Sequence, residues 1–120
     1  MPKPENAEEL AQAAAEKWLS FTEKGDASES WALASTTFKG AVTEAQWAES
    51  LQKAQAGVGR PLSRDLKTAE YHSELPGARD GHYVILTYDT RFEHKQKGTE
   101  TVVPELDDDG EWRVSGYFVK

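Results

Sequence analysis

Residues 82–95 read HYVILTYDTRFEHK, and this stretch decides the fold. Apolar and polar side chains alternate along it, which is typical of a β-strand with one buried face. We expect the more apolar face to contact the core, and it consists of Val84, Leu86, Tyr88, Thr90 and Phe92. The same two-residue period predicts further strands near 63–74, 99–106 and 111–119.

Short connections between these strands predict an antiparallel meander. Residues 75–81 read LPGARDG and are rich in turn residues. We expect Lys97-Gly98 to turn the second hairpin and Asp109-Gly110 to turn the third. The Asp-Gly dipeptide is the strongest hairpin signal in the chain.

The first half of the chain has a period near 3.6 and predicts three helices. Each has a start signal, a short polar residue followed three positions later by Glu or Gln, and these pairs are Asn6/Glu9, Asp26/Glu29 and Thr43/Gln46. The apolar stripes that we expect to be buried are Leu10/Ala14/Trp18/Phe21, Ala27/Trp31/Ala34/Phe38 and Trp47/Leu51/Ala54/Val58.

Together these patterns predict an α+β fold in which three N-terminal helices pack on a curved, four-stranded antiparallel meander. The chain has 120 residues, a common size for one domain. We therefore expect residues 1–120 to form a single domain, with residues 1–5 disordered.

Composition excludes several functions. The net charge of −7 argues against nucleic acid as a partner, because phosphate binding needs a basic face. The chain has no cysteine, which rules out disulfides, zinc–thiolate sites and thiol nucleophiles. No apolar run approaches the roughly 20 residues of a membrane span. We expect no transmembrane segment and no cofactor.

Charged and hydroxyl side chains in the middle of the sheet form one candidate site. Arg64 is expected to share the inner face with its strand's apolar residues, and Glu100 is its candidate partner. One interpretation, which we favour, is a buried ion pair that joins the first and third strands. The other is the floor of an anion-recognising pocket, with Tyr88 and Thr90 as hydroxyl donors.

Two further clusters are weaker candidates for metal binding. His72 and His82 flank one loop, but a polar loop end rarely fixes ligands, so we expect exposed histidines and no metal. Residues 107–111 read DDDGE and lack the ligand spacing of a calcium loop. We expect them to form a solvated hairpin tip.

The outer sheet face is a candidate interface for a homodimer or a protein partner. Tyr83, Ile85 and Tyr117 are expected to lie there and to form an apolar patch. In the last strand the expected inner set is Trp112, Val114, Gly116 and Phe118. At Gly116 the strand is predicted either to make room for a helix or to bulge.

Several stretches carry a family resemblance. Residues 75–84 read LPGARDGHYV, and with 88–92, 99–102 and 110–118 they resemble a bacterial family, the domain of unknown function numbered 4019. Arg79 and His82 depart from its pattern, which has proline and an acidic residue there. The resemblance implies a cystatin-like cone related to nuclear-transport-factor-two-like domains. It also implies export, to the periplasm or out of the cell, with the leader absent from this chain; a cytoplasmic location stays open.

The resemblance implies no activity, so three functions are considered. The first is a non-catalytic exported domain that binds a partner or small ligand through its cone or outer sheet face. The second is a small enzyme with Arg64, Tyr88 and Glu100 at the floor of the cone. The third is a structural module that forms homo-oligomers through the outer sheet face.

Overall fold

The computed structural model describes residues 2–120. The helices are α1 (Ala7–Glu23), α2 (Ala27–Leu33), α3 (Thr36–Ala41) and α4 (Glu44–Val58). The strands are β1 (Pro61–His72), β2 (Tyr83–Phe92), β3 (Lys95–Leu106) and β4 (Trp112–Val119). They pair antiparallel in the order β1-β2-β3-β4, which confirms the predicted α+β fold. Residue 1 lies outside the described part, and disorder of residues 1–5 stays a prediction.

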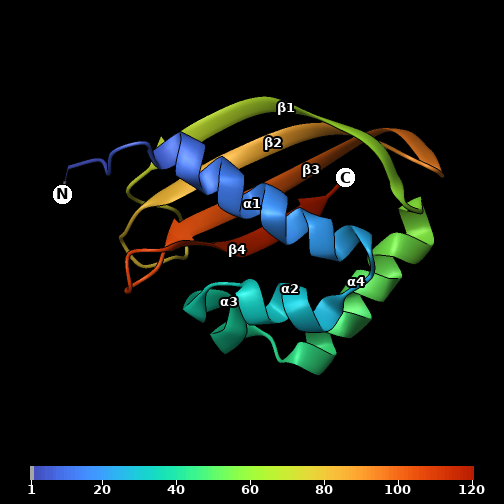
Figure 1. Ribbon diagram of the computed structural model, residues 1–120, viewed down its shortest axis with the longest axis horizontal. Coiled ribbons are helices and arrows are strands. Elements are labelled where there is room, and N and C mark those ends of the chain that lie inside the picture. The colour runs from blue at the N-terminus through green and yellow to red at the C-terminus, as the bar shows by residue number, and fades with distance from the viewer. Residues whose placement is uncertain (1) are drawn as a thin grey trace.

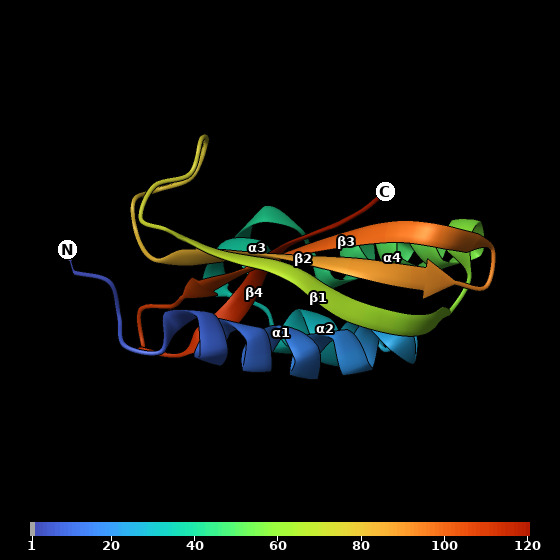
Figure 2. The same cartoon turned by 90° about the horizontal axis from the view of Figure 1, so that it is seen from above.

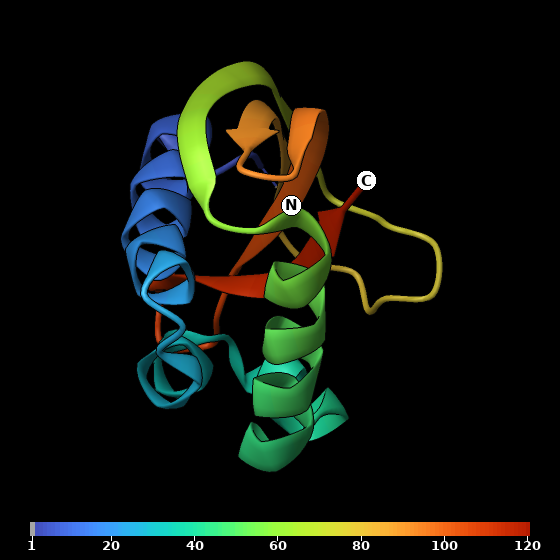
Figure 3. The ribbon, with the colours of Figure 1, turned by 90° about the vertical axis from the view of Figure 1, so that its right-hand side faces the viewer.

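The helices lie on one side of a curved sheet. Figure 1 shows α1 crossing one face of the sheet, with α2, α3 and α4 gathered beside β4. The β1–β2 loop projects from the side opposite to α1 (Figure 2), and β1 curves over the molecule towards α4 (Figure 3). We call the face that contacts α1 the inner face and the opposite one the outer face. This arrangement fits the expected cone.

Residues 2–120 form four helices where the sequence predicted three, because the second predicted helix breaks at Ala34. Its backbone is extended there (φ −73°, ψ 165°), and Ser35 begins α3. The sheet holds this break: the backbone N–H of Ser35 donates to the carbonyl of Val114 at 2.9 Å, and that of Thr36 donates to the Asp107 carboxylate at 3.0 Å. Asp107 is therefore buried, and the predicted solvated hairpin tip is wrong for this residue.

The three predicted helix starts are at the right residues, and two of the three predicted side-chain caps form. Asp26 accepts a hydrogen bond from the backbone N–H of Glu29 at 3.0 Å, and Thr43 forms a complete capping box with Gln46. The cap predicted for the first helix is absent: Asn6 directly precedes α1, but it adopts a left-handed conformation (φ 54°, ψ 30°) and its side chain makes no capping bond.

In α1 the predicted burial of Trp18 is confirmed, but a ridge of alanines is buried beside it in place of Leu10. Ala7, Ala11 and Ala15 are fully buried in line with Trp18, since small side chains let the helix approach the sheet closely. Leu10, which was predicted to lie in the core, is 50% exposed. The helix is rotated from the predicted orientation, and this rotation leaves a leucine at the surface beside β4.

Aromatic rings fill the space between helices and sheet. The ring centroids of Trp18 and Trp47 are 5.5 Å apart, and Tyr117 lies 5.3 Å from Trp18. Both indoles donate to Ser30 at 2.8 Å, Trp18 to its carbonyl and Trp47 to its hydroxyl. The interpretation of these tryptophans as core residues is confirmed.

The second hairpin turns earlier than predicted. Its turn is Glu93-His94, and Gly98 lies inside β3. The ring of Phe92 covers Gly98 so closely that a Cβ there would lie 2.6 Å from the ring. The glycine is thus a packing requirement, which the sequence pattern did not distinguish from a turn signal.

A bulge in β4 reverses the expected faces of its last residues. Gly116 pairs with Val103 and Val114 pairs with Pro104, so Ser115 is an extra residue in β4. The predicted bulge is therefore present, but its effect on the following side chains was not foreseen.

Candidate functional site

The four residues that were predicted to share a site do lie together on the inner face. Arg64 stands opposite Thr90, and Tyr88 stands opposite Glu100. The Arg64 Nε–Glu100 Oε1 distance is 2.7 Å and the Nη2–Oε2 distance is 3.3 Å. Thr90 donates to the same Oε1 at 2.6 Å. The predicted ion pair between the first and third strands is present.

Three residues that the sequence did not suggest complete this group. The guanidinium of Arg64 also contacts Glu23, and Tyr117 donates a hydrogen bond to Glu100 Oε2. The Tyr88 hydroxyl donates to Glu16 at 3.3 Å. Glu16 and Glu23 are seven positions apart in α1, so both lie on one face of the helix. This spacing is the one sequence feature that could have indicated their place in the group. The Glu100 cluster is defined as Glu16, Glu23, Arg64, Tyr88, Thr90, Glu100 and Tyr117.

The electrostatics keep the two phenols and the guanidinium of the cluster in their hydrogen-bonding forms. Burial, reinforced by the charge of Glu100, raises the pKa of the Tyr117 phenol well above its usual range. Burial and the charge of Glu16 do the same for the pKa of Tyr88. Burial opposes the charge of Arg64, but its bonds to the two partner carboxylates outweigh this and raise its pKa. The phenols stay donors and the guanidinium stays cationic.

The Glu100 cluster is closely packed. A cavity lined by Arg64, Glu100 and Tyr117 has a volume of about 20 Å³, which is room for one water molecule. Both oxygens of Glu100 already accept hydrogen bonds. This leaves no space for a substrate at that point and suits a structural ion-pair network.

A larger hollow lies between α1 and β4. Its volume is about 650 Å³, and α1 contributes Leu10, Ala13, Ala14, Lys17 and Trp18. The end of α2 contributes Leu33, and the β3–β4 hairpin and β4 contribute Gly110 to Val114. We call it the α1–β4 groove. The sequence did not predict this groove, because its pattern placed Leu10 in the buried stripe of α1.

The groove contains few free polar groups. Three tryptophan indoles have acceptors, Trp31 donating to the Val42 carbonyl at 2.9 Å. Trp112 borders the groove and is 8% exposed; within residues 2–120 its indole N–H has no acceptor, and solvent reaches it. Arg113 is held by Asp109 at 2.7 and 2.8 Å. Lys17 has no carboxylate within 4.0 Å in the same part of the chain.

The three residues that were predicted to lie on the outer face are found in three different environments. Ile85 is half-buried on the outer face. Tyr83 is buried beneath the β1–β2 loop, where its hydroxyl donates to the Arg79 carbonyl at 2.6 Å. The placement of Tyr117 on this face is wrong, because the bulge turns it inward and turns Phe118 outward, where it is 62% exposed.

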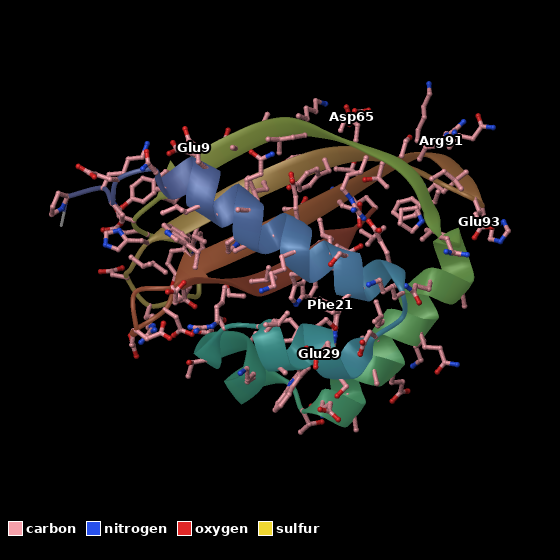
Figure 4. All side chains as sticks on the ribbon, viewed as in Figure 1. Glu9, Phe21, Glu29, Asp65, Arg91 and Glu93 are labelled. Atoms are coloured by element: carbon pink, nitrogen blue, oxygen red, sulfur yellow. The ribbon has the colours of Figure 1, made fainter. Side chains whose placement is uncertain are left out.

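The outer face near the β2–β3 hairpin carries charged side chains and not an apolar patch. In Figure 4, Asp65 on β1 and Arg91 on β2 point away from the helices, while Glu93 marks the end of the β2–β3 hairpin. Asp65 and Asp89 stand directly opposite each other across β1 and β2. This end is hydrophilic on its outer side.

His72 and His82 are half-buried and not exposed as predicted, and the Nε2 of His72 has no hydrogen-bond partner within residues 2–120. His82 Nδ1 lies 2.6 Å from the Tyr71 hydroxyl, and His72 lies 3.6 Å from Glu70. Among residues 2–120, no group of three or more histidines and carboxylates could hold a metal ion. Over the same residues, no helix combines the length and apolar character that crossing a membrane requires.

Comparison with known proteins assigns a family without assigning a function. No curated protein matches the chain. Residues 14–117 match the sequence profile described as "Protein of unknown function (DUF4019)", a span that includes β1, β2 and β3, most of α1 and of β4, and the residues of the Glu100 cluster. The chain belongs to this DUF4019 family.

Proposed function

We propose that this chain is a non-catalytic binding domain whose ligand occupies the α1–β4 groove. The ligand is a small molecule with an apolar body and a hydrogen-bond-accepting group. The observation that carries this proposal is a 650 Å³ hollow lined by tryptophan, leucine and alanine side chains. Ligand pockets commonly measure about 300–1,000 Å³ and combine apolar walls with a few placed polar groups.

The apolar body of the ligand is inferred from the walls. Leu10, at 50% exposure, and Leu33 stand on the rim, and Trp18 and Val114 lie deeper. Burial of an apolar molecule against these side chains removes both surfaces from water, which contributes about 25 cal/mol per Å².

The accepting group is inferred from Trp112. Its indole N–H has no acceptor within residues 2–120 and is reached by solvent, so a ligand acceptor can take the place of water there. A ligand carbonyl, hydroxyl or carboxylate in the groove supplies that acceptor. Lys17 on the rim adds an attraction for an anionic acceptor, since its ammonium is not engaged by a carboxylate in the described residues.

The Glu100 cluster supports a non-catalytic role. Its carboxylate and guanidinium satisfy one another, and the adjoining cavity of about 20 Å³ is too small for a substrate. A catalytic acid or base needs a position within hydrogen-bond reach of a reacting group. The α1–β4 groove offers Lys17 and Glu111 at its border but no paired acid and base held at such a distance.

Decanoate and decanol serve as probes in a test by NMR. We expect the indole N–H signal of Trp112 to shift saturably with probe concentration, while those of Trp31 and Trp47, which lie outside the groove, move little. The variant Leu10→Asp should weaken binding about tenfold, or about 1.4 kcal/mol. The control is Leu62→Asp, because Leu62 on β1 is 56% exposed and lies outside the groove.

The two probes separate the two parts of the proposal. Binding of decanoate more tightly than decanol, with the difference removed by Lys17→Gln, supports an anionic acceptor. Absence of a saturable Trp112 shift with both probes contradicts the proposed function. Equal weakening by Leu10→Asp and Leu62→Asp contradicts the groove as its location.

Export is also a proposal, and it rests on the family resemblance. Fractionation of cells that carry the native gene tests it. Recovery of the protein in the periplasmic or extracellular fraction is the expected result, and recovery with the cytoplasmic enzymes would contradict it.

A further inference from the structure

The second half of β4 is an open sheet edge. Thr99 and Lys120 exchange backbone hydrogen bonds at 3.1 and 2.9 Å. Because bonded and non-bonded pairs alternate in an antiparallel ladder, the N–H and C=O groups of Tyr117 and Val119 point away from β3. Within residues 2–120, no backbone group on that side bonds to them.

The first half of the same edge is covered. The carbonyl of Val114 points away from β3 and accepts the bond from Ser35 at the start of α3. The bulge at Ser115 separates the two halves. From Gly116 to Val119 the edge has neither a charged side chain nor a proline, the usual devices against pairing with another chain.

An apolar patch adjoins this open edge on the outer face. Phe118 is 62% exposed, and it stands opposite Thr101 in the ladder. Val103 pairs with Gly116, which is the next residue pair on the same face of the sheet. A Cβ at Gly116 would lie 3.4 Å from the Phe118 ring and 3.6 Å from Val103, so the ring lies over the glycine, close to Val103.

We propose that β4 pairs with β4 of a second copy of this chain, antiparallel about a twofold axis at Phe118. In this register Tyr117 of each copy exchanges backbone hydrogen bonds with Val119 of the other, and the two Phe118 rings face each other. The four-stranded sheet continues into its symmetric counterpart.

The register is what identifies the occupant as a second copy. The open segment has its exposed aromatic residue at its centre, with one outward-pointing backbone unit on each side. In antiparallel pairing about a twofold axis the central residue faces itself, so each copy supplies the ring, the donors and the acceptors that the other lacks.

Sedimentation velocity and amide hydrogen exchange test this arrangement together. The wild-type mass should rise with concentration from 13.3 kDa towards twice that value. The variant Phe118→Glu, which places two carboxylates opposite each other at the axis, should stay monomeric throughout. Leu62→Glu changes an exposed leucine on the other edge strand and should dimerise like the wild type.

Amide exchange identifies the edge. In the wild-type dimer the amides of Tyr117 and Val119 should be protected, and in Phe118→Glu they should exchange rapidly. The amide of residue 118 bonds to β3 and should be protected in both proteins. A monomeric wild type, a dimeric Phe118→Glu, or a dimer with unprotected Tyr117 and Val119 amides each overturns the proposal. The groove lies on the inner face, so none of these results bears on ligand binding there.

Discussion

The hydroxyl of Tyr117 donates a hydrogen bond to Glu100, a carboxylate that is only 1% exposed. Val114 and Tyr117 are three positions apart, and in a regular strand they would face opposite sides of the sheet. Both face inward because Ser115 is an extra residue in β4. One inserted residue thus supplies a donor to a buried carboxylate and turns Phe118 out to solvent.

Removal of the Glu100 charge should destabilise the fold strongly. The variant Glu100→Gln keeps the side-chain shape but leaves Arg64, which is mostly buried, with Glu23 as its only anionic partner. We expect the free energy of unfolding in urea to fall by about 3 kcal/mol. The control Glu49→Gln breaks an exposed pair with Lys53 and should cost less than about 0.5 kcal/mol. Similar losses in the two variants would show that Glu100 is not part of a buried network.

Stability at high pH should depend on the Tyr117 phenol. Burial and the Glu100 charge raise its pKa in the folded state above the unfolded value of about 10. Its contribution is therefore complete below pH about 10 and is lost as the pH rises further, by up to about 1.4 kcal/mol per pH unit. Above this pH, the free energy of unfolding measured in urea should fall more steeply with pH for the wild type than for Tyr117→Phe.

A control with no titrating group makes this prediction specific. Phe118→Leu changes the neighbouring, exposed ring and should show the wild-type pH dependence. Parallel curves for the wild type and Tyr117→Phe would mean that the phenol titrates alike in the folded and unfolded chains.

The sequence predicted those parts of the fold that depend on local periodicity. The two-residue alternation of β2 placed Val84, Leu86 and Tyr88 on the buried face, because neighbouring side chains on a strand necessarily alternate. The pairing of Arg64 with Glu100 followed from the same alternation in β1 and β3. To predict this contact, it was enough that β1 and β3 each place one charged side chain, of opposite sign, on the inner face.

What the sequence did not predict depends on partners distant in the chain. The helix break at Ala34 is held by Val114 and Asp107, which local propensity does not include. The groove was missed because the stripe containing Leu10 and the alternative ridge starting at Ala7 have the same helical period. Only packing against the sheet selects the ridge of small side chains.

Two glycines should respond in opposite directions to alanine. At Gly98 a Cβ would lie 2.6 Å from the Phe92 ring and 3.0 Å from the Thr90 carbonyl, so Gly98→Ala should cost about 1–3 kcal/mol. At Gly57, inside α4, nothing lies within 4 Å. Gly57→Ala should stabilise by about 0.5–1 kcal/mol, because alanine loses less backbone entropy in a helix. Thermal unfolding of the two variants measures both changes, and a neutral Gly98→Ala would contradict the close packing of Phe92.

The ion pair at the β3–β4 hairpin should be visible in the titration of one carboxyl group. Hydrogen bonds from Arg113 lower the pKa of Asp109 to about 2. A group whose folded-state pKa is depressed stabilises the fold above its unfolded pKa, and this stability is lost as the pH falls towards the folded value. In a carbon-13 NMR titration, Arg113→Gln should return the Asp109 pKa towards the ordinary value of 3.8. The control Lys17→Gln removes a different cation from the groove and should leave the Asp109 pKa unchanged. A pKa shift of equal size in both variants would mean that the overall positive charge of the groove, and not the Arg113 contact, sets the Asp109 pKa.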